Sequence, residues 1–200
     1  GEAEAVRRAH AEHFASLAAA AERELVGPGQ GAGLRRLDEE HANLRAALAW
    51  TEERREAAPA LDLAAGLWRY CLARGLIREG RARLDAVLAF TSTADPAARA
   101  RVLNGAATLA HNEGDNRAAQ RLLQEALAVH RALGDDRGVA EVLNNYSWVA
   151  CELTSLEEAE ALGREALERN RALGETRGVA LSLNNLGWIA AYRGECAEAA

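Results

Sequence analysis

The chain has 200 residues, a formal net charge of −6 at pH 7 and no lysine or methionine. Nucleic-acid affinity rests mostly on neutralising phosphates, so an acidic chain with scattered arginines is a poor candidate for that function. No apolar run reaches the length of a membrane span, and no secretory signal is present.

The amino-acid composition and the cysteines suggest the source and the compartment. The missing lysine and methionine are typical of a high-GC bacterial coding sequence, and a start at Gly1 with an end inside an expected helix suggests a fragment. The three cysteines are far apart and an odd number: Cys71, Cys151 and Cys196. We expect small buried thiols in a reducing cytoplasm.

Residues 1–56 are predicted to form a helical hairpin. Apolar residues recur at helical spacing over residues 2–25, and the glycine- and proline-rich segment 27–31 ends that helix. A second helix is expected over residues 34–54, with His41 and Asn43 stabilising the junction of the hairpin. Residues 57–92 are predicted to be a divergent repeat unit, with helices over 57–74 and 77–90.

Residues 97–200 contain a phrase that recurs after forty residues. Arg137–Ala140 with Leu143 and Trp148 returns as Arg177–Ala180 with Leu183 and Trp188. A fixed period in this range indicates stacked helical units. Helices are predicted over residues 97–112, 116–133, 139–153, 156–173 and 179–193, followed by a truncated helix from residue 195. Residues 134–138 and 174–178 are expected to be linkers.

Small residues at fixed places in each unit resemble the tetratricopeptide repeat (TPR) pattern. They are Ala107, Ala119 and Ala126 in one unit, and Ser147, Ala159 and Ala166 in the next. The resemblance implies an all-α, right-handed α-α superhelix of TPR-like helical hairpins, in which small side chains let paired helices approach closely. The period of forty exceeds the usual thirty-four, and HEAT-like pairs are the alternative.

A wider resemblance covers nearly the whole chain. The phrase from Glu40 to Leu48, Glu-His-Ala-Asn-Leu-Arg-Ala-Ala-Leu, resembles the segment that follows the ATPase module of large bacterial STAND-type regulators of the LuxR and antibiotic-regulator kind. This resemblance implies that an ATPase module lies elsewhere in the parent chain. It also implies that the repeats act as a sensor or interaction arm.

No motif in the chain indicates catalysis, a cofactor or a metal. A phosphate-binding loop, a His-Glu-x-x-His pair, a Gly-x-Ser-x-Gly elbow and a Cys-x-x-Cys pair are all missing from the sequence. His10 and His13 lie three apart on one helix, where a half-buried, hydrogen-bonded pair is more plausible than metal ligation. We therefore predict a non-enzymatic protein without a cofactor.

Asparagines in helix interiors are the sharpest local signal. Asn competes for backbone hydrogen bonds and disfavours such positions, yet it recurs in every clear unit. Asn and an aromatic or Thr four residues later share a helix face. The expected partner-binding surface comprises Asn104, Thr108, Asn144, Trp148, Asn184 and Trp188, with Arg101 and Glu141 one turn earlier.

An amide can pair with any peptide backbone, so this surface predicts binding of a protein or peptide in the concave groove. The competing interpretation gives the amides a structural role between helices. In a mixed form, Asn145 and Asn185 are structural while Asn144 and Asn184 are exposed. Two other functions stay open: a self-associating or autoinhibitory scaffold, and a small-molecule receptor with a pocket around Trp50, Trp68 and Tyr70.

Overall fold

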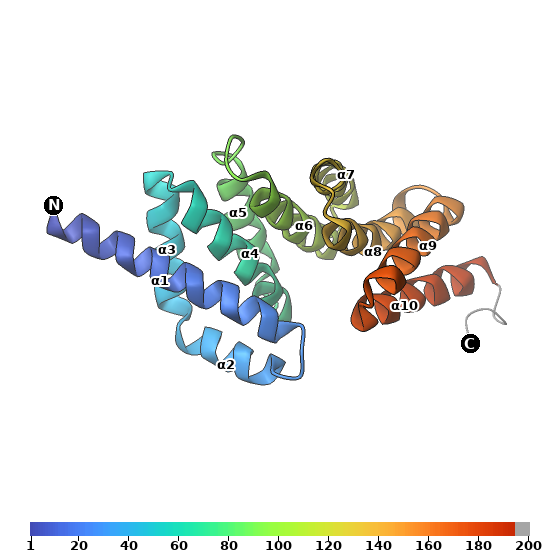
Figure 1. The fold of residues 1–200 in the computed structure, drawn as a ribbon, viewed down its shortest axis with the longest axis horizontal. Coiled ribbons are helices and arrows are strands. Elements are labelled where there is room, and N and C mark those ends of the chain that lie inside the picture. The colour runs from blue at the N-terminus through green and yellow to red at the C-terminus, as the bar shows by residue number, and fades with distance from the viewer. Residues whose placement is uncertain (195–200) are drawn as a thin grey trace. The chain divides into compact units, whose positions relative to one another are not determined.

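The computed structural model describes residues 1–194, and this part of the chain contains helices and no strands (Figure 1). The helices are α1 (Glu2–Leu25), α2 (Gln30–Glu39), α3 (His41–Arg54), α4 (Ala57–Ala73), α5 (Ile77–Leu88), α6 (Pro96–Asn112), α7 (Asn116–Leu133), α8 (Asp136–Leu153), α9 (Leu156–Leu173) and α10 (Thr176–Arg193). They form two compact units, residues 1–109 and residues 110–200. The predicted all-α class is confirmed, and no described helix is long and apolar enough to cross a bilayer.

The first unit is organised around the packing of α1 on α4. A Cβ atom at Gly66 of α4 would lie 2.6 Å from the backbone of Ala18 in α1, so only glycine permits this approach. The side chains of α1 that face inward are correspondingly small, since Ala11, Ala18 and Ala21 are fully buried there. The first helix is thus part of the core of this unit.

The predicted helix over residues 34–54 is two helices. α2 ends at Glu39 and α3 begins at His41, with Glu40 between them. No glycine or proline marks this break in the sequence. We attribute it to side-chain contacts. Asp38 is hydrogen-bonded to Tyr70 of α4 and to Arg74, the residue directly after α4. Asn43 donates to Glu40 Oε2 across the junction at 2.7 Å.

The predicted linkers over residues 134–138 and 174–178 are shorter than expected. α7 and α9 end at Leu133 and Leu173, and each is capped by a glycine at positive φ, Gly134 and Gly174. α8 and α10 begin two residues after these glycines. Asp135 starts α8 by accepting a hydrogen bond from the Gly138 amide at 3.0 Å. All four helices have 18 residues, so longer helices account for the period of forty.

Glycine in the repeated phrase is required by a buried side chain of the preceding helix. A Cβ atom at Gly138 would lie 2.1 Å from His130 Nδ1, and one at Gly178 would lie 2.0 Å from Asn170 Oδ1. Both polar side chains are buried, with 3% and 4% of their surfaces exposed. The first turn of each new helix therefore rests directly on the end of the one before it.

Small residues inside the units behave as the repeat pattern predicts. All six small positions named for the two units, Ala107, Ala119, Ala126, Ser147, Ala159 and Ala166, are fully buried. Gly163 of α9 is also close to α10, because its Cβ would lie 3.0 Å from Leu186. In the second unit α8 and α9, which carry Ser147, Ala159 and Ala166, pack against each other, as expected.

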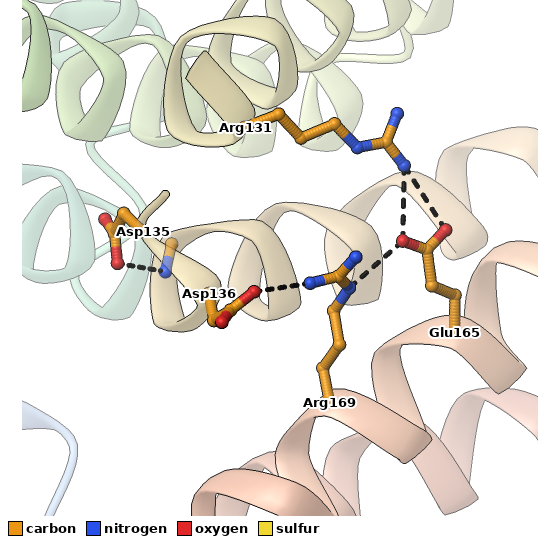
Figure 2. A network of polar contacts seen from close by, with 6 residues as sticks. Arg131, Asp135, Asp136, Glu165 and Arg169 are labelled. Carbon is orange, nitrogen blue, oxygen red and sulfur yellow. Dashed lines mark hydrogen bonds and ion pairs between the residues drawn. The ribbon is translucent and has the colours of Figure 1, made fainter. Parts of the chain in front are cut away.

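Ion pairs link α7, α8 and α9 on the surface of the second unit (Figure 2). Arg131 of α7 contacts both carboxylate oxygens of Glu165 in α9, at 3.2 and 3.3 Å. Arg169 of α9 contacts Glu165 at 3.0 Å and Asp136 of α8 at 2.5 Å. Because these side chains are partly exposed, each pair contributes at most about 1 kcal/mol.

The cysteines are less buried than predicted. Cys71 and Cys151 are half-buried free thiols, and burial raises the pKa of Cys71 to about 11. Burial also raises the pKa of Cys151. Cys196, Ala200 and the truncated helix expected from residue 195 lie outside the described residues.

Replacing Gly138 by alanine should lower the free energy of unfolding by about 1–3 kcal/mol, because the new methyl group would overlap His130. Chemical denaturation in urea measures the change. Gly31→Ala in α2 is the matched control, since its Cβ would meet only the end of Arg35 at 3.7 Å. There the same change should stabilise by about 0.5–1 kcal/mol, because alanine favours helix. Equal effects at both positions would contradict the contact with His130.

Candidate functional site

Four aromatic rings form a continuous row across the second unit, and we call them the aromatic row: His111, Trp148, Trp188 and Tyr192. His111 and Trp188 each meet Trp148 edge-on, with ring centroids 6.4 Å apart in both pairs. Tyr192 continues the row 6.5 Å from Trp188. Such edge-to-face spacing is favourable for aromatic rings.

Exposure increases along the row toward α10. Trp148 is half-buried, whereas Trp188 is 51% exposed and Tyr192 is 65% exposed. Leu181 lies two helical turns before Trp188 on the same face and is 41% exposed. Large apolar side chains gathered on one surface indicate an interaction surface.

Asn144, predicted as a candidate for exposure, is buried, so that expectation is wrong. Only 6% of its surface is exposed, and its Oδ1 accepts a hydrogen bond from Ser182 of α10 at 2.7 Å. Asn170 of α9 donates to the same Ser182 oxygen at 3.3 Å. The Ser182 hydroxyl therefore joins α8, α9 and α10, because a buried polar group needs partners inside the protein.

The predicted split between neighbouring asparagines holds for Asn184 and Asn185 and is wrong for Asn144. Asn185, expected to be structural, donates from Nδ2 to the Asn144 carbonyl oxygen at 2.8 Å and to Ser147 Oγ at 3.2 Å. Asn145 is half-buried on α8. Asn184 is exposed, as that prediction required. The exposed face of α10 thus carries one amide beside the aromatic row rather than a ladder of amides.

The three predicted residues in the first unit make contacts within that unit. Asn104 is 4% exposed, which contradicts a place on an open surface. Thr108 is half-buried and donates to the Asn104 carbonyl oxygen at 3.0 Å. Arg101 contacts Glu22 of α1 and Asp62 of α4, both at 3.3 Å. Arg101 therefore links α6 to α1 and α4.

Glu141 is exposed on α8, as expected for a surface position. The sequence reasoning missed Tyr192, Leu181 and His111. Helical spacing could have identified two of them, because Tyr192 lies one turn after Trp188 and Leu181 lies two turns before it. His111 joins the row only through its contact with Trp148.

The first unit contains an apolar cavity between α3, α4 and α5. Its interior volume is about 40 Å³. Its walls include Leu44, Leu48, Ala64, Leu67, Tyr70 and Leu84. Of the three aromatic residues expected around a pocket, only Tyr70 lines this cavity, while Trp50 and Trp68 are buried with 7% and 5% exposure.

A polar cluster holds Tyr70 in place at this cavity. Its hydroxyl donates to Asp38 Oδ1 at 3.1 Å, and Arg74 binds both oxygens of Asp38 at 2.9 and 2.5 Å. The Arg74 hydrogen bonds hold the pKa of Asp38 below its ordinary value. Burial, with the hydrogen bond to Asp38, raises the pKa of Tyr70 to about 12.

The two histidines weighed as metal ligands both contact the ring of Phe14. His10 is half-buried with its ring centroid 4.6 Å from that of Phe14, and His13 is exposed with a separation of 5.0 Å. Residues 1–194 hold no group of three or more side chains suited to a metal ion.

The helical hairpins and their close-packed small residues define a TPR-like repeat fold, and repeats of this kind generally mediate protein–protein interactions. The sequence profile of the tetratricopeptide repeat matches residues 98–172. No curated protein matches the chain. These findings favour the TPR-like interpretation over HEAT-like pairs.

Two solved structures share this fold. A putative kinesin light chain of Podosopora anserina with nearly identical TPR-like repeats is 18% identical, with 95% of this chain and 91% of that chain covered and a TM-score of 0.70. BtubC (BKLC) from P. vanneervenii is 17% identical, with 98% and 84% covered and a TM-score of 0.68. At such identity the likeness concerns the fold alone.

Replacing Asn144 by alanine should cost about 1–3 kcal/mol of unfolding free energy, because Ser182 would lose a buried acceptor. Asn184→Ala, at the equivalent place in the next repeat, is exposed and should change it by less than about 0.5 kcal/mol. Urea denaturation of both variants measures the difference. Equal losses of unfolding free energy would contradict a larger contribution from the buried amide.

Acid should remove the contribution of Asp38 to stability. A carboxyl whose folded pKa is depressed stabilises above its unfolded pKa, and this contribution is lost as pH falls through the folded value. The stability advantage of wild type over Asp38→Asn should therefore be constant near neutrality and shrink below about pH 4. Urea denaturation across pH measures it, and the effect should diminish in an Arg74→Gln background. An advantage independent of pH would contradict the role of Arg74.

Proposed function

We propose that this chain is a non-catalytic protein- or peptide-interaction domain whose binding surface is the aromatic row with Asn184. The observation that carries the proposal is the exposure of Trp188 and Tyr192, at 51% and 65%, in line with Trp148. In TPR-like repeats of the kind this chain resembles, the first helix of each pair lines the concave groove. α8 and α10 hold that place in the repeat.

The energetics favour aromatic anchors with polar support. Covering about 200 Å² of ring surface would contribute about 5 kcal/mol. A micromolar complex needs about 8 kcal/mol, so the rings alone fall short. Hydrogen bonds from Asn184, which is exposed on α10, would supply part of the remainder. Tryptophan and tyrosine are also the residues that most often dominate binding energy at interfaces.

The buried amides support this surface from below. Asn144 and Asn185 fix α10 against α8, and this contact sets the spacing between Trp148 and Trp188. A surface held by interhelical hydrogen bonds binds with little loss of conformational freedom. In this proposal the asparagines position the aromatic rings, and the rings contact the partner.

The parent protein, in this proposal, is a cytoplasmic bacterial signalling ATPase or transcriptional regulator of the STAND or LuxR kind. The phrase from Glu40 to Leu48 supports it, because it resembles the segment that follows the ATPase module of such regulators. The coding region upstream should then encode a phosphate-binding loop. An upstream region without one would remove this part of the proposal and leave the interaction surface untouched.

Replacing Trp188 by alanine should weaken partner binding at least tenfold. Peptides selected from a random display library on the wild-type chain supply the ligand, and calorimetric titration measures the affinity. Leu133→Ala is the matched control, because Leu133 is 49% exposed in the same unit but lies on α7. Its affinity should stay within twofold of wild type.

Two results would change this assignment. Equal affinities for Trp188→Ala and wild type would exclude the aromatic row as the binding surface. Sedimentation measured across a concentration range tests the alternative that copies of this chain associate with each other. A dimer in wild type that is absent in Trp188→Ala would make the row an interface between copies of this chain.

A further inference from the structure

An acidic side chain accompanies the aromatic row at one of its ends. Glu152 follows Trp148 by four residues in α8, so the two side chains share a helix face. Glu152 is exposed, and it holds in α8 the place that Tyr192 holds in α10, forty residues later. Because Trp148 and Trp188, at equivalent places in the two helices, are in ring contact, the carboxylate belongs to the same surface as the rings.

Hydrogen bonds fix the position of this carboxylate relative to the rings. Asn116 of α7 donates from Nδ2 to Glu152 Oε2. In turn, Asn116 Oδ1 accepts a hydrogen bond from His111 Nδ1 at 2.7 Å, and the His111 ring contacts Trp148 edge-on. Within residues 1–194 the Glu152 carboxylate is bonded to this neutral amide and to no arginine. Its negative charge is therefore held beside the rings without a counter-ion from the described part of the chain.

The same end of the row lies at the carboxyl ends of three helices. His111, Glu152 and Tyr192 are the residues before the last in α6, α8 and α10. The carboxyl end of a helix has a partial negative charge and favours a cation nearby. Arg193, the last residue of α10, contacts Glu160 of α9 at 2.7 Å, so its charge is already compensated. The local electrostatics thus favour a cation supplied from outside.

The net charge of the chain resides entirely in the second unit. Residues 1–109 contain fifteen acidic residues and fifteen arginines, whereas residues 110–200 contain fifteen acidic residues and nine arginines. The formal net charge of −6 therefore belongs to the unit that carries the aromatic row. Such a field attracts basic segments and repels acidic ones, over a screening length of about 8–10 Å at physiological salt.

We propose that this end of the aromatic row binds an arginine or lysine side chain, so that the partner segment is a basic peptide. The inference rests on the proposed function, because it names the chemistry of the partner at the same surface. The cation lies over the exposed ring of Trp188 or Tyr192, and Glu152 is its counter-ion. Since Asn116 already holds the carboxylate, little freedom is lost on binding. An acidic segment would place like charges together and is disfavoured.

Peptides selected on the wild-type chain from a random display library test the charge of the partner. Arginine and lysine should be enriched at least threefold over the unselected library. Calorimetric titration of a selected peptide should show at least tenfold weaker binding when its arginines and lysines are replaced by glutamine. Neutral or acidic peptides that bind and lose affinity in Trp188→Ala would overturn this inference and leave the proposed function standing. Equal affinity of the selected peptides for Trp188→Ala and wild type would overturn both.

Glu152→Gln tests the counter-ion, because it removes the charge and keeps an oxygen that can accept from Asn116. Binding of the selected basic peptide should weaken at least fivefold, whereas the glutamine-substituted peptide should bind within twofold of its affinity for wild type. Glu168→Gln is the matched control, since Glu168 is exposed on α9 and its replacement changes the net charge equally. It should leave the affinity within twofold of wild type. Equal weakening by the two substitutions, or none by Glu152→Gln, would overturn the assignment of Glu152.

Discussion

The contact between a buried polar side chain and a glycine at the start of the next helix governs the second unit. His130 lies under Gly138, and Asn170 lies under Gly178, at distances that admit no Cβ atom. This contact fixes where α8 and α10 begin and so sets their register. Because Trp148 and Trp188 stand at the same place in their helices, the register brings their rings together.

Hydrogen bonds then decide which side chains remain on the surface. Asn144 and Ser182 pair between α8 and α10, and Asn185 bonds back to the α8 backbone. Asparagine is unfavourable inside a helix, and these hydrogen bonds to neighbouring helices offset that cost. The side chains that remain exposed beside these amides are mainly aromatic. The surface of the second unit therefore carries the aromatic row and not a row of amides.

The first unit uses a different solution. Glycine and alanine bring α1 onto α4, and Trp68 packs against Gly105 of α6, where a Cβ would lie 2.6 Å from the ring. This dense contact contrasts with the space left between α3 and α5. Those two helices are bridged by ion pairs across a carbon-lined cavity. The second unit thus carries an exposed aromatic surface, whereas the first unit contains an apolar cavity.

The sequence by itself determined the helices, their period and the small residues between them, because these depend on local spacing and on glycine and proline. It also marked Trp148 and Trp188. Only the tertiary structure decided that Asn144 is buried, because its partner Ser182 belongs to the following repeat. The break at Glu40 likewise follows from contacts of Asp38 with α4, which no local pattern encodes.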